Sequence, residues 1–211
     1  MLGIVVLLII DRSHRADVSK LELQLIEEKE AEIQEFFTET LGLLRIQVDP
    51  ELLEFSSGWE RDIPRRIIQE HAAFDEVSII DLQGKEVIRA SRAGEERDLL
   101  YVTELPAFKM AAEGEIFIGE VHRSFVGPSL TLAAPIRVED RVILVVIAEV
   151  NIRDVLRSLD ASRLGTAGYL LAVDQNGTLL NGKKTGISLN AVDRVRRSLA
   201  GQRLNGLEPR D

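Results

Sequence analysis

The sequence predicts an α+β fold in which a long N-terminal helix packs on a five-stranded antiparallel sheet. Residues 16–47 carry apolar side chains at three- and four-residue steps, and no glycine or proline interrupts them before Gly42. From Phe74 onward, apolar and polar residues alternate with the period of a strand. Short turns separate the last three strands of this region, which makes them antiparallel neighbours. The helix is then expected to cover one face of the sheet.

Length and composition exclude several classes of protein. The 211 residues, 45% hydrophobic and 29% charged, are typical of one or two globular domains. The net charge of −9 repels phosphate backbones, so nucleic acid is not an expected partner. The absence of cysteine excludes disulfides and thiolate metal sites, and His14, His71 and His122 lie far apart in the sequence. We therefore expect neither a metal nor a cofactor.

The N-terminal segment is strongly apolar. Residues 1–10 contain eight valines, leucines and isoleucines, and Asp11-Arg12 follows. A membrane-spanning helix needs about 20 such residues. We interpret residues 1–10 as a partial transmembrane helix, which would place the following residues on the far side of the membrane. The alternative is a buried strand or helix of a soluble protein.

Residues 11–48 are predicted to form a long signalling helix. Its glutamates are expected to form a solvated face. The apolar stripe is narrow between residues 26 and 37, which favours packing on the sheet and against a sister helix in a homodimer.

The order of the remaining elements follows from turn signals. Two helical pieces are expected within residues 51–73, separated at Ile63-Pro64, and Pro106 and Gly114 delimit a short helix. The strands are predicted at residues 77–81, 85–88, 116–123, 129–138 and 142–151, with a helix over 152–160.

The chain contains an internal repeat. Asp81-Leu82-Gln83-Gly84 and Asp174-Gln175-Asn176-Gly177 each follow an apolar strand and precede further apolar residues. Aspartate and glycine favour a tight turn in each copy. Two copies predict two related domains. The second has only its hairpin and one helix at residues 190–200, so the chain is expected to be a piece of a longer protein.

Several segments in order resemble the double Cache sensor region of bacterial transmembrane receptors. These are "FDEVSIIDLQGKEVIRASR", "ELPAFKMAAEGEIFIGEV", "GPSLTLAAPIRVEDRVILVVIAEVNIRDVL" and "GTAGYLLAVDQNGTLL". The resemblance covers roughly residues 15–211. It implies a membrane-distal PAS-like Cache domain at residues 49–160 and an incomplete membrane-proximal one at residues 161–211.

The resemblance also implies a function. The chain would be the periplasmic ligand-sensing part of an inner-membrane signal-transduction receptor, with a two-component sensor histidine kinase as the favoured output. The alternatives are the sensor of a diguanylate cyclase or chemoreceptor, or a membrane-tethered protein-interaction module without a small ligand. No catalytic motif such as Gly-x-Ser-x-Gly or a P-loop occurs, so the fragment itself is not expected to be an enzyme.

A ligand site is predicted on one face of strand 129–138. Leu130, Leu132, Ala134 and Ile136 form a face suited to the long helix, whereas the opposite face is small and hydroxyl-bearing and leaves room for a ligand. Arginine forks bind carboxylates, so a small anionic metabolite is the favoured ligand. The predicted ligand-binding residues are Arg89, Arg92, Tyr101, Phe108, Phe117, Ser129, Thr131, Ala133 and Asn151.

Several other residues bear on the ligand class and the extent of this site. The amino-acid-binding branch of the resembled family has an Arg-x-x-Trp-Tyr motif and a strand-end aspartate. Residues 95–101 contain no Trp-Tyr pair, and the neutral Asn151 holds an ammonium less well than a carboxylate does. His122 is interpreted as a structural histidine. Glu149 is either a polar exception within an apolar strand or a solvated strand end.

Overall fold

The computed structural model describes residues 4–9, 20–46, 62–94, 98–164, 168–174 and 180–181. The chain divides into two compact units, Glu35–Arg153 and the combination of Met1–Gln34 with Asp154–Asp211. Within the described residues, no helix has both the length and the apolar character needed to cross a membrane.

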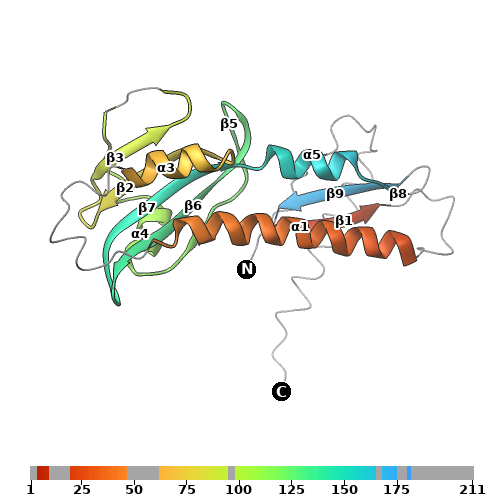
Figure 1. Ribbon diagram of the computed structural model, residues 1–211, viewed down its shortest axis with the longest axis horizontal. Coiled ribbons are helices and arrows are strands. Elements are labelled where there is room, and N and C mark those ends of the chain that lie inside the picture. The colour runs from red at the N-terminus through yellow and green to blue at the C-terminus, as the bar shows by residue number, and fades with distance from the viewer. Residues whose placement is uncertain are drawn as a thin grey trace, which may run out of the picture. The chain divides into compact units, whose positions relative to one another are not determined.

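The unit Glu35–Arg153 is built on an antiparallel sheet with the strand order β3-β2-β7-β6-β4, in which β5 also pairs with β6 (Figure 1). The strands are β2 (Phe74–Asp81), β3 (Glu86–Ser91), β4 (Phe117–Ile118), β5 (His122–Ser124), β6 (Gly127–Val138) and β7 (Arg141–Asn151). The long hairpin of β6 and β7 forms the centre of the sheet. The predicted antiparallel α+β architecture is confirmed.

The sheet has six strands rather than five because the strand predicted at residues 116–123 is two separate strands. Phe117 pairs with Ala133 and His122 pairs with Ser129, both on β6. Between them the Gly119 amide still donates to Thr131 O at 2.8 Å. The chain leaves the regular ladder after this glycine and rejoins it as β5.

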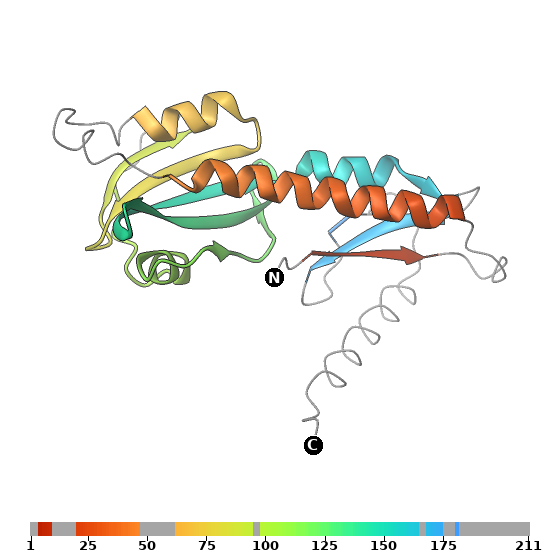
Figure 2. The same ribbon diagram turned by 60° about the horizontal axis from the view of Figure 1, so that its bottom comes forward.

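Helices cover both faces of this sheet. Helix α3 (Asp62–Glu70) and the part of α1 (Lys20–Leu44) that belongs to this unit lie on one face, and α4 (Pro106–Ala112) lies on the other (Figure 2). Ala133 packs with α4. Because strand side chains alternate, Leu132 then faces α1 and α3. The residues of the predicted leucine face, Leu130, Leu132, Ala134 and Ile136, are all at most 1% exposed.

The structure confirms the prediction for one helix, α4, and corrects it for another, α3. Helix α4 begins at Pro106 and is followed by Gly114, whose φ of 94° favours glycine, as expected. Helix α3 runs through Ile63-Pro64 without the predicted break. The reason is that Pro64 lies in the first turn, where its missing N–H costs no hydrogen bond. The first helical piece predicted within residues 51–73 lies outside the described residues.

The second unit contains a three-stranded sheet of β1 (Ile4–Ile9), β9 (Gly168–Asp174) and β8 (Arg163–Leu164). Strand β1 pairs antiparallel with β9, from Ile4 opposite Asp174 to Ile9 opposite Tyr169. This strand replaces the partial transmembrane helix predicted for residues 1–10. Its valines and isoleucines favour a strand when another strand is available to pair with.

Residues 180 and 181 return alongside β9, as the repeat predicts. The Leu180 amide donates to Ala172 O at 2.9 Å. The side chain of Asn181 accepts from the Ala172 amide at 2.8 Å and donates to Leu170 O at 3.1 Å. The turn that joins them and the helix predicted at residues 190–200 lie outside the described residues.

Within this second unit, α1 and α5 (Arg153–Ala161) are joined by polar side chains. Lys29 Nζ donates to Ser158 Oγ at 2.8 Å and to Glu32 Oε2 at 2.6 Å, and Ser158 Oγ donates to Glu32 at 3.1 Å. These hydrogen bonds fix one point of α1 against α5.

Candidate functional site

The face of the sheet that carries α4 has an apolar half and a polar half. The apolar half packs under α4. Its buried members are Ile80, Ala107, Phe108, Ala111, Ala133 and Val145. Phe117 and Ile147 are partly buried at its edge. Toward the other end of β6 and β7, the same face carries polar side chains that α4 does not cover.

Glu149 lies at the centre of the polar half. Its carboxylate accepts a hydrogen bond from Thr131 Oγ1 at 3.1 Å, because Thr131 is directly opposite on β6. Its other oxygen, Oε1, contacts His122 Nε2 on β5 as an ion pair. Oε1 itself is buried, and His122 is its partner. The side chain of Glu149 is 25% exposed and that of His122 is 45% exposed, so solvent reaches this contact from the histidine side.

The pKa of Glu149 is raised above its usual value. Burial is the largest cause, because it disfavours the charged carboxylate. The charge of His122 and the hydrogen bonds from Thr131 and His122 lower the pKa, and the charge of Glu76 raises it further. Ionising Glu149 at this position therefore costs free energy. Carboxylates in such environments are typical of functional sites.

Strands β2 and β3 contribute charged side chains next to Glu149. Glu76 is paired with Glu149 across the β2–β7 ladder. Arg89 on β3 donates to Glu86 Oε2 and to Asp98 O, both at 2.8 Å, and lies 3.9 Å from Glu76. Its Nε is buried without a hydrogen-bond partner. Two of the three guanidinium nitrogens of Arg89 thus already contact carboxylates or a carbonyl oxygen. Little of the charge of Arg89 is left to bind an anionic ligand.

Arg92 does not belong to this face, contrary to the sequence-based hypothesis. Its guanidinium donates to Ile68 O at 2.5 Å, His71 O at 2.9 Å and Phe74 O at 3.2 Å. Two of these carbonyls lie at the C-terminal end of α3, where a helix presents unpaired carbonyls and favours a positive charge. Arg92 is a helix-capping residue, and we exclude it from the candidate site.

The room expected beside the small residues of β6 is filled. Ser129 is 0% exposed, and its hydroxyl pairs with Ser124 Oγ at 2.9 Å in the β5–β6 turn. Ala133 is 0% exposed and packs, with Phe108, in the cluster under α4. These three predicted ligand residues therefore have structural roles. The sequence could not show this because the element that covers a small-residue face is decided only by packing.

The other predicted residues are dispersed around the polar half. Tyr101 is 71% exposed and bridges to Lys85 at the β2–β3 hairpin. Asn151 donates to Asp75 Oδ1 at 3.1 Å and to Ala72 O at 3.3 Å, so it ties the end of β7 to the start of β2. Phe117 borders the polar half. Of the nine predicted residues, Arg89, Thr131 and Phe117 lie in or beside it.

Sequence reasoning did not place His122 and Glu149 in the site. One signal was available: Glu149 is the single charged residue between Arg141 and Asn151 in an otherwise apolar strand. The partner of Glu149 could not be found in the same way. His122 lies on β5, and the interruption that separates β5 from β4 was not predicted from the sequence. His122, interpreted from the sequence as a structural histidine, is 45% exposed and is paired with Glu149.

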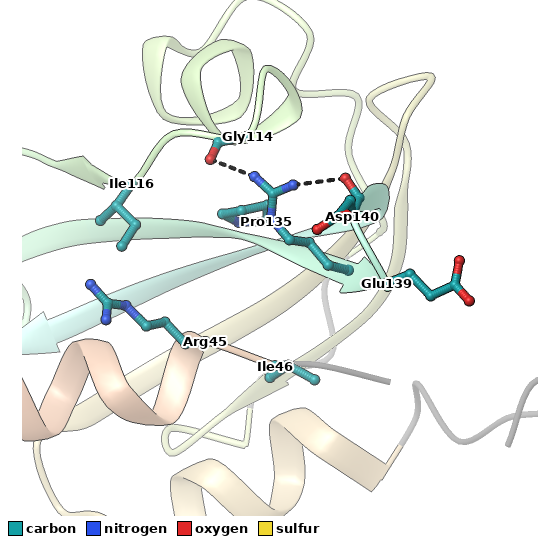
Figure 3. A pocket seen from close by; sticks show the side chains of 8 residues that line it. Arg45, Ile46, Gly114, Ile116, Pro135, Glu139 and Asp140 are labelled. Carbon is teal, nitrogen blue, oxygen red and sulfur yellow. Dashed lines mark hydrogen bonds between the residues drawn. The ribbon is translucent and has the colours of Figure 1, made fainter. Parts of the chain in front are cut away.

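A cavity of about 340 Å³ lies at the opposite end of β6 (Figure 3). Arg137 spans it by donating to Gly114 O at 2.9 Å and to Asp140 O at 3.1 Å, and Arg45 enters from the end of α1. The lining residues are Arg45, Ile46, Gly114, Ile116, Pro135, Arg137, Glu139 and Asp140. The lining contains two arginines and two carboxylates, and Arg137 links Gly114, just after α4, to the β6–β7 turn.

The fold is shared with solved sensory domains. The sensory domain of the Campylobacter jejuni chemoreceptor Tlp3 aligns with a TM-score of 0.62 at 13% identity, over 83% of this chain and 79% of that one. The ligand-binding domain of the Pseudomonas aeruginosa amino acid chemoreceptor PctC, in complex with GABA, aligns with a TM-score of 0.58 at 16% identity, over 82% and 79%. This chain has the fold of these sensory domains.

The likeness extends to a protein described as a histidine kinase, vpHK1S-Z8. Its extracellular domain aligns with a TM-score of 0.55 at 16% identity, over 85% of this chain and 76% of that one. No protein-family model and no curated protein matches the sequence. The resemblance to the Cache sensor region is therefore confirmed at the level of the fold.

Proposed function

We propose that this chain is the extracytoplasmic sensory domain of a transmembrane receptor and that it binds a small molecule on the polar half of the α4-covered sheet face. One observation carries the proposal. In a fold shared with ligand-binding sensory domains, this face holds a largely buried carboxylate, Glu149, in contact with Thr131 and with the 45% exposed His122. Burial raises the pKa of this carboxyl, and carboxyls with raised pKa values gather at functional sites.

The position of this face explains how binding would reach the signalling helix. Thr131 and Glu149 belong to β6 and β7, and the reverse side of the same strands carries Leu130 and Leu132 toward α1. A ligand that shifts these strands changes the surface on which α1 rests. A ligand at 100 times its Kd contributes about 2.7 kcal/mol to the state that it binds, which is enough to bias a two-state receptor with a small energy gap.

The proposal includes the setting expected from the sequence. The sensor lies in the periplasm, is anchored in the inner membrane and forms a homodimer through the N-terminal helix. The distal sensor unit corresponds to residues 49–160, with the start of a membrane-proximal unit at 161–211. A sensor histidine kinase is the favoured output, and a chemoreceptor or a diguanylate cyclase is the alternative.

A protein-interaction module without a small ligand is a second candidate. It is favoured by exposed apolar side chains near the β2–β3 hairpin and on the β5–β6 turn. These are Leu99, Leu100, Tyr101, Leu105 and Phe125. Exposed apolar patches mark sites of protein contact in many soluble proteins.

A ligand screen tests the first proposal. The purified chain is heated with individual amino acids, including isoleucine and GABA, with primary amines and with small organic acids. We expect at least one compound to raise the Tm with saturation. Replacing Thr131 by valine, which removes one hydroxyl from the polar half, should weaken the response, whereas Glu104→Gln, at a 90% exposed carboxylate that pairs with Lys109, should not.

Two results decide against the proposal. A screen in which no compound raises the Tm would remove the small-molecule function and favour the interaction module. A Tm rise of equal size in the wild type and in Thr131→Val and Glu149→Gln variants would place the ligand elsewhere.

A further inference from the structure

We propose that the cavity at the end of β6 is a second binding site, separate from the polar half that carries Glu149, and that it takes a small carboxylate with a short apolar body. The cavity has a volume of about 340 Å³, which lies at the lower end of the range for small-molecule sites. Three segments of the unit Glu35–Arg153 line it: the end of α1, the end of β6 with the turn into β7, and the residues that follow α4 (Figure 3). This site does not depend on the function proposed for the polar half.

Arg137 joins the three segments that line the cavity. Its amide donates to Ile46 O at 3.3 Å, and its guanidinium donates to Gly114 O at 2.9 Å and to Asp140 O at 3.1 Å. The approach to the segment after α4 is close, since a Cβ on Gly114 would lie 2.5 Å from a terminal nitrogen of Arg137. The guanidinium is therefore held in one position before any ligand arrives, which lowers the entropic cost of binding.

The two arginines that line the cavity carry charges that no carboxylate of the described chain neutralises. Among the residues that the structure describes, neither Arg45 nor Arg137 forms an ion pair, and both side-chain partners of Arg137 are uncharged backbone carbonyls. A guanidinium has five N–H donors, and these two carbonyls take two of them. Three N–H donors of Arg137 are therefore left for a ligand.

The two carboxylates of the lining are placed where they compete little with a ligand for these arginines. Glu139 and Asp140 form the turn between β6 and β7, and both are exposed, so water and salt screen their charges. Figure 3 shows the side chain of Glu139 directed away from the cavity, whereas Arg45 extends from the end of α1 toward Ile116. The uncompensated charge that a ligand meets is therefore mainly that of the two arginines.

Arg45 also offsets the negative end of α1, because it directly follows Leu44 and a helix C-terminus favours a positive charge. The partial charge at such an end is about half of an elementary charge and falls off within the last turn. The ends of α1 and α4 together thus supply about one negative charge against two guanidiniums. A positive excess remains after both helix ends are offset.

The rest of the lining is apolar and sets the body of the ligand. Ile46, Ile116 and Pro135 are half-buried parts of it. Guanidiniums bind carboxylates through two parallel hydrogen bonds, and apolar side chains are stabilised when a hydrocarbon displaces water from them. A short aliphatic acid meets both conditions, with its carboxylate on the arginines and its carbon chain on the apolar lining. An inorganic anion such as phosphate would leave the apolar lining in water.

A ligand in this cavity contacts the end of the long helix directly. Two lining residues, Arg45 and Ile46, follow immediately after α1. The polar half, by contrast, reaches α1 only through the strands that carry Thr131 and Glu149. Binding in the cavity therefore stabilises the arrangement in which the end of α1, the end of β6 and the segment after α4 meet.

Pentanoate, pentylamine and pentanol share one carbon chain and test the ligand class by calorimetric titration of the full chain. We expect pentanoate to bind with saturation, at least about tenfold more tightly than the amine or the alcohol. Arg45→Gln, at an exposed position where the substitution should not disturb folding, should weaken pentanoate binding at least about tenfold. The matched control is Arg141→Gln, which removes the same charge from an exposed arginine of the same hairpin that does not line the cavity. It should leave the affinity unchanged.

The place of binding is tested by methyl NMR spectroscopy of the isoleucine side chains. Addition of pentanoate should shift the signals of Ile46 and Ile116, which line the cavity. The signal of Ile147, at the edge of the cluster under α4, should not move. Thr131→Val, in the polar half, should leave the affinity for pentanoate unchanged.

The outcomes separate this site from the proposed function. Equal affinity for the three compounds, or equal weakening by Arg45→Gln and Arg141→Gln, overturns the carboxylate site. Binding that shifts Ile147 and is lost in Thr131→Val places the acid in the polar half, so this inference fails and the proposed function stands. If pentanoate does not saturate the chain at up to about 10 mM, the arginines only offset the helix ends and the inference fails, whatever compound binds the polar half.

Discussion

Glu149 and His122 meet across β6, although they lie on strands that do not pair with each other. The burial that raises the pKa of Glu149 outweighs the favourable charge of His122. A raised folded-state pKa means that the protonated form is favoured by folding, so this contribution to stability is present at low pH and lost as the pH rises. At neutral pH the ionised Glu149 therefore destabilises the fold.

Glu149→Gln should consequently raise the stability of the ligand-free chain at pH 7. The neutral amide avoids the cost of burying a charge, and we expect a gain of up to about 1 kcal/mol, or about 2–4 °C in Tm. Thermal unfolding monitored by circular dichroism at pH 7 and at pH 4 checks this. The gain should shrink at pH 4, where the wild-type carboxyl takes up its proton. A variant less stable than the wild type at pH 7 would show that the histidine pair outweighs burial.

Arg92→Met should destabilise the unit Glu35–Arg153 without changing ligand binding. The substitution removes the hydrogen bonds to Ile68 O, His71 O and Phe74 O and the positive charge at the end of α3. We expect a loss of about 2 kcal/mol in denaturant unfolding. Arg141→Met, at an exposed position at the start of β7, is the control and should cost little. A loss of ligand affinity in folded Arg92→Met would return Arg92 to the binding site.

Gly114→Ala should be more destabilising than Gly94→Ala, although both glycines have positive φ. A Cβ on Gly114 would lie 2.5 Å from a terminal nitrogen of Arg137, whereas a Cβ on Gly94 meets nothing within 4 Å. Gly94→Ala then reports backbone strain alone, at about 1 kcal/mol, and Gly114→Ala adds the displacement of Arg137, for a total of about 2 kcal/mol. Equal losses of unfolding free energy would mean that Arg137 moves aside at no cost.

Ala133→Leu should destabilise the chain because Ala133 is fully buried under α4. Three added carbon atoms overfill this contact, and we expect a cost of about 1–3 kcal/mol. Ala161→Leu, at the exposed end of α5, adds the same atoms where there is space and should be nearly neutral. If Ala133→Leu proves neutral by chemical denaturation, the face beside β6 has the room that the sequence predicted.

Local sequence patterns were sufficient to predict most of the element order in the unit Glu35–Arg153 and the direction of the leucine face. Both follow from local rules: apolar residues repeat with the period of a helix or a strand, and glycine, proline and aspartate mark the turns. These rules correctly assigned Leu130 and Leu132 to the side that faces the long helix and Pro106 to a helix start. They also predicted the hairpin at Asp81 and Gly84 and the antiparallel pairing of β6 with β7.

Local patterns could not predict which polar side chains face one another, because this depends on long-range packing. Two arginines near the end of one strand look alike in sequence, yet Arg89 lies on the sheet face that carries Glu149 and Arg92 caps α3. Residues an odd number of positions apart in an extended chain point to opposite sides and so meet different elements. The contact between His122 and Glu149 depends on the interruption of the ladder at Gly119 and on the strand order, which are properties of long-range pairing. Long-range pairing also explains why residues 4–9 form a strand: they pair with β9. The secondary structure of so short an apolar segment depends on the element that it packs against.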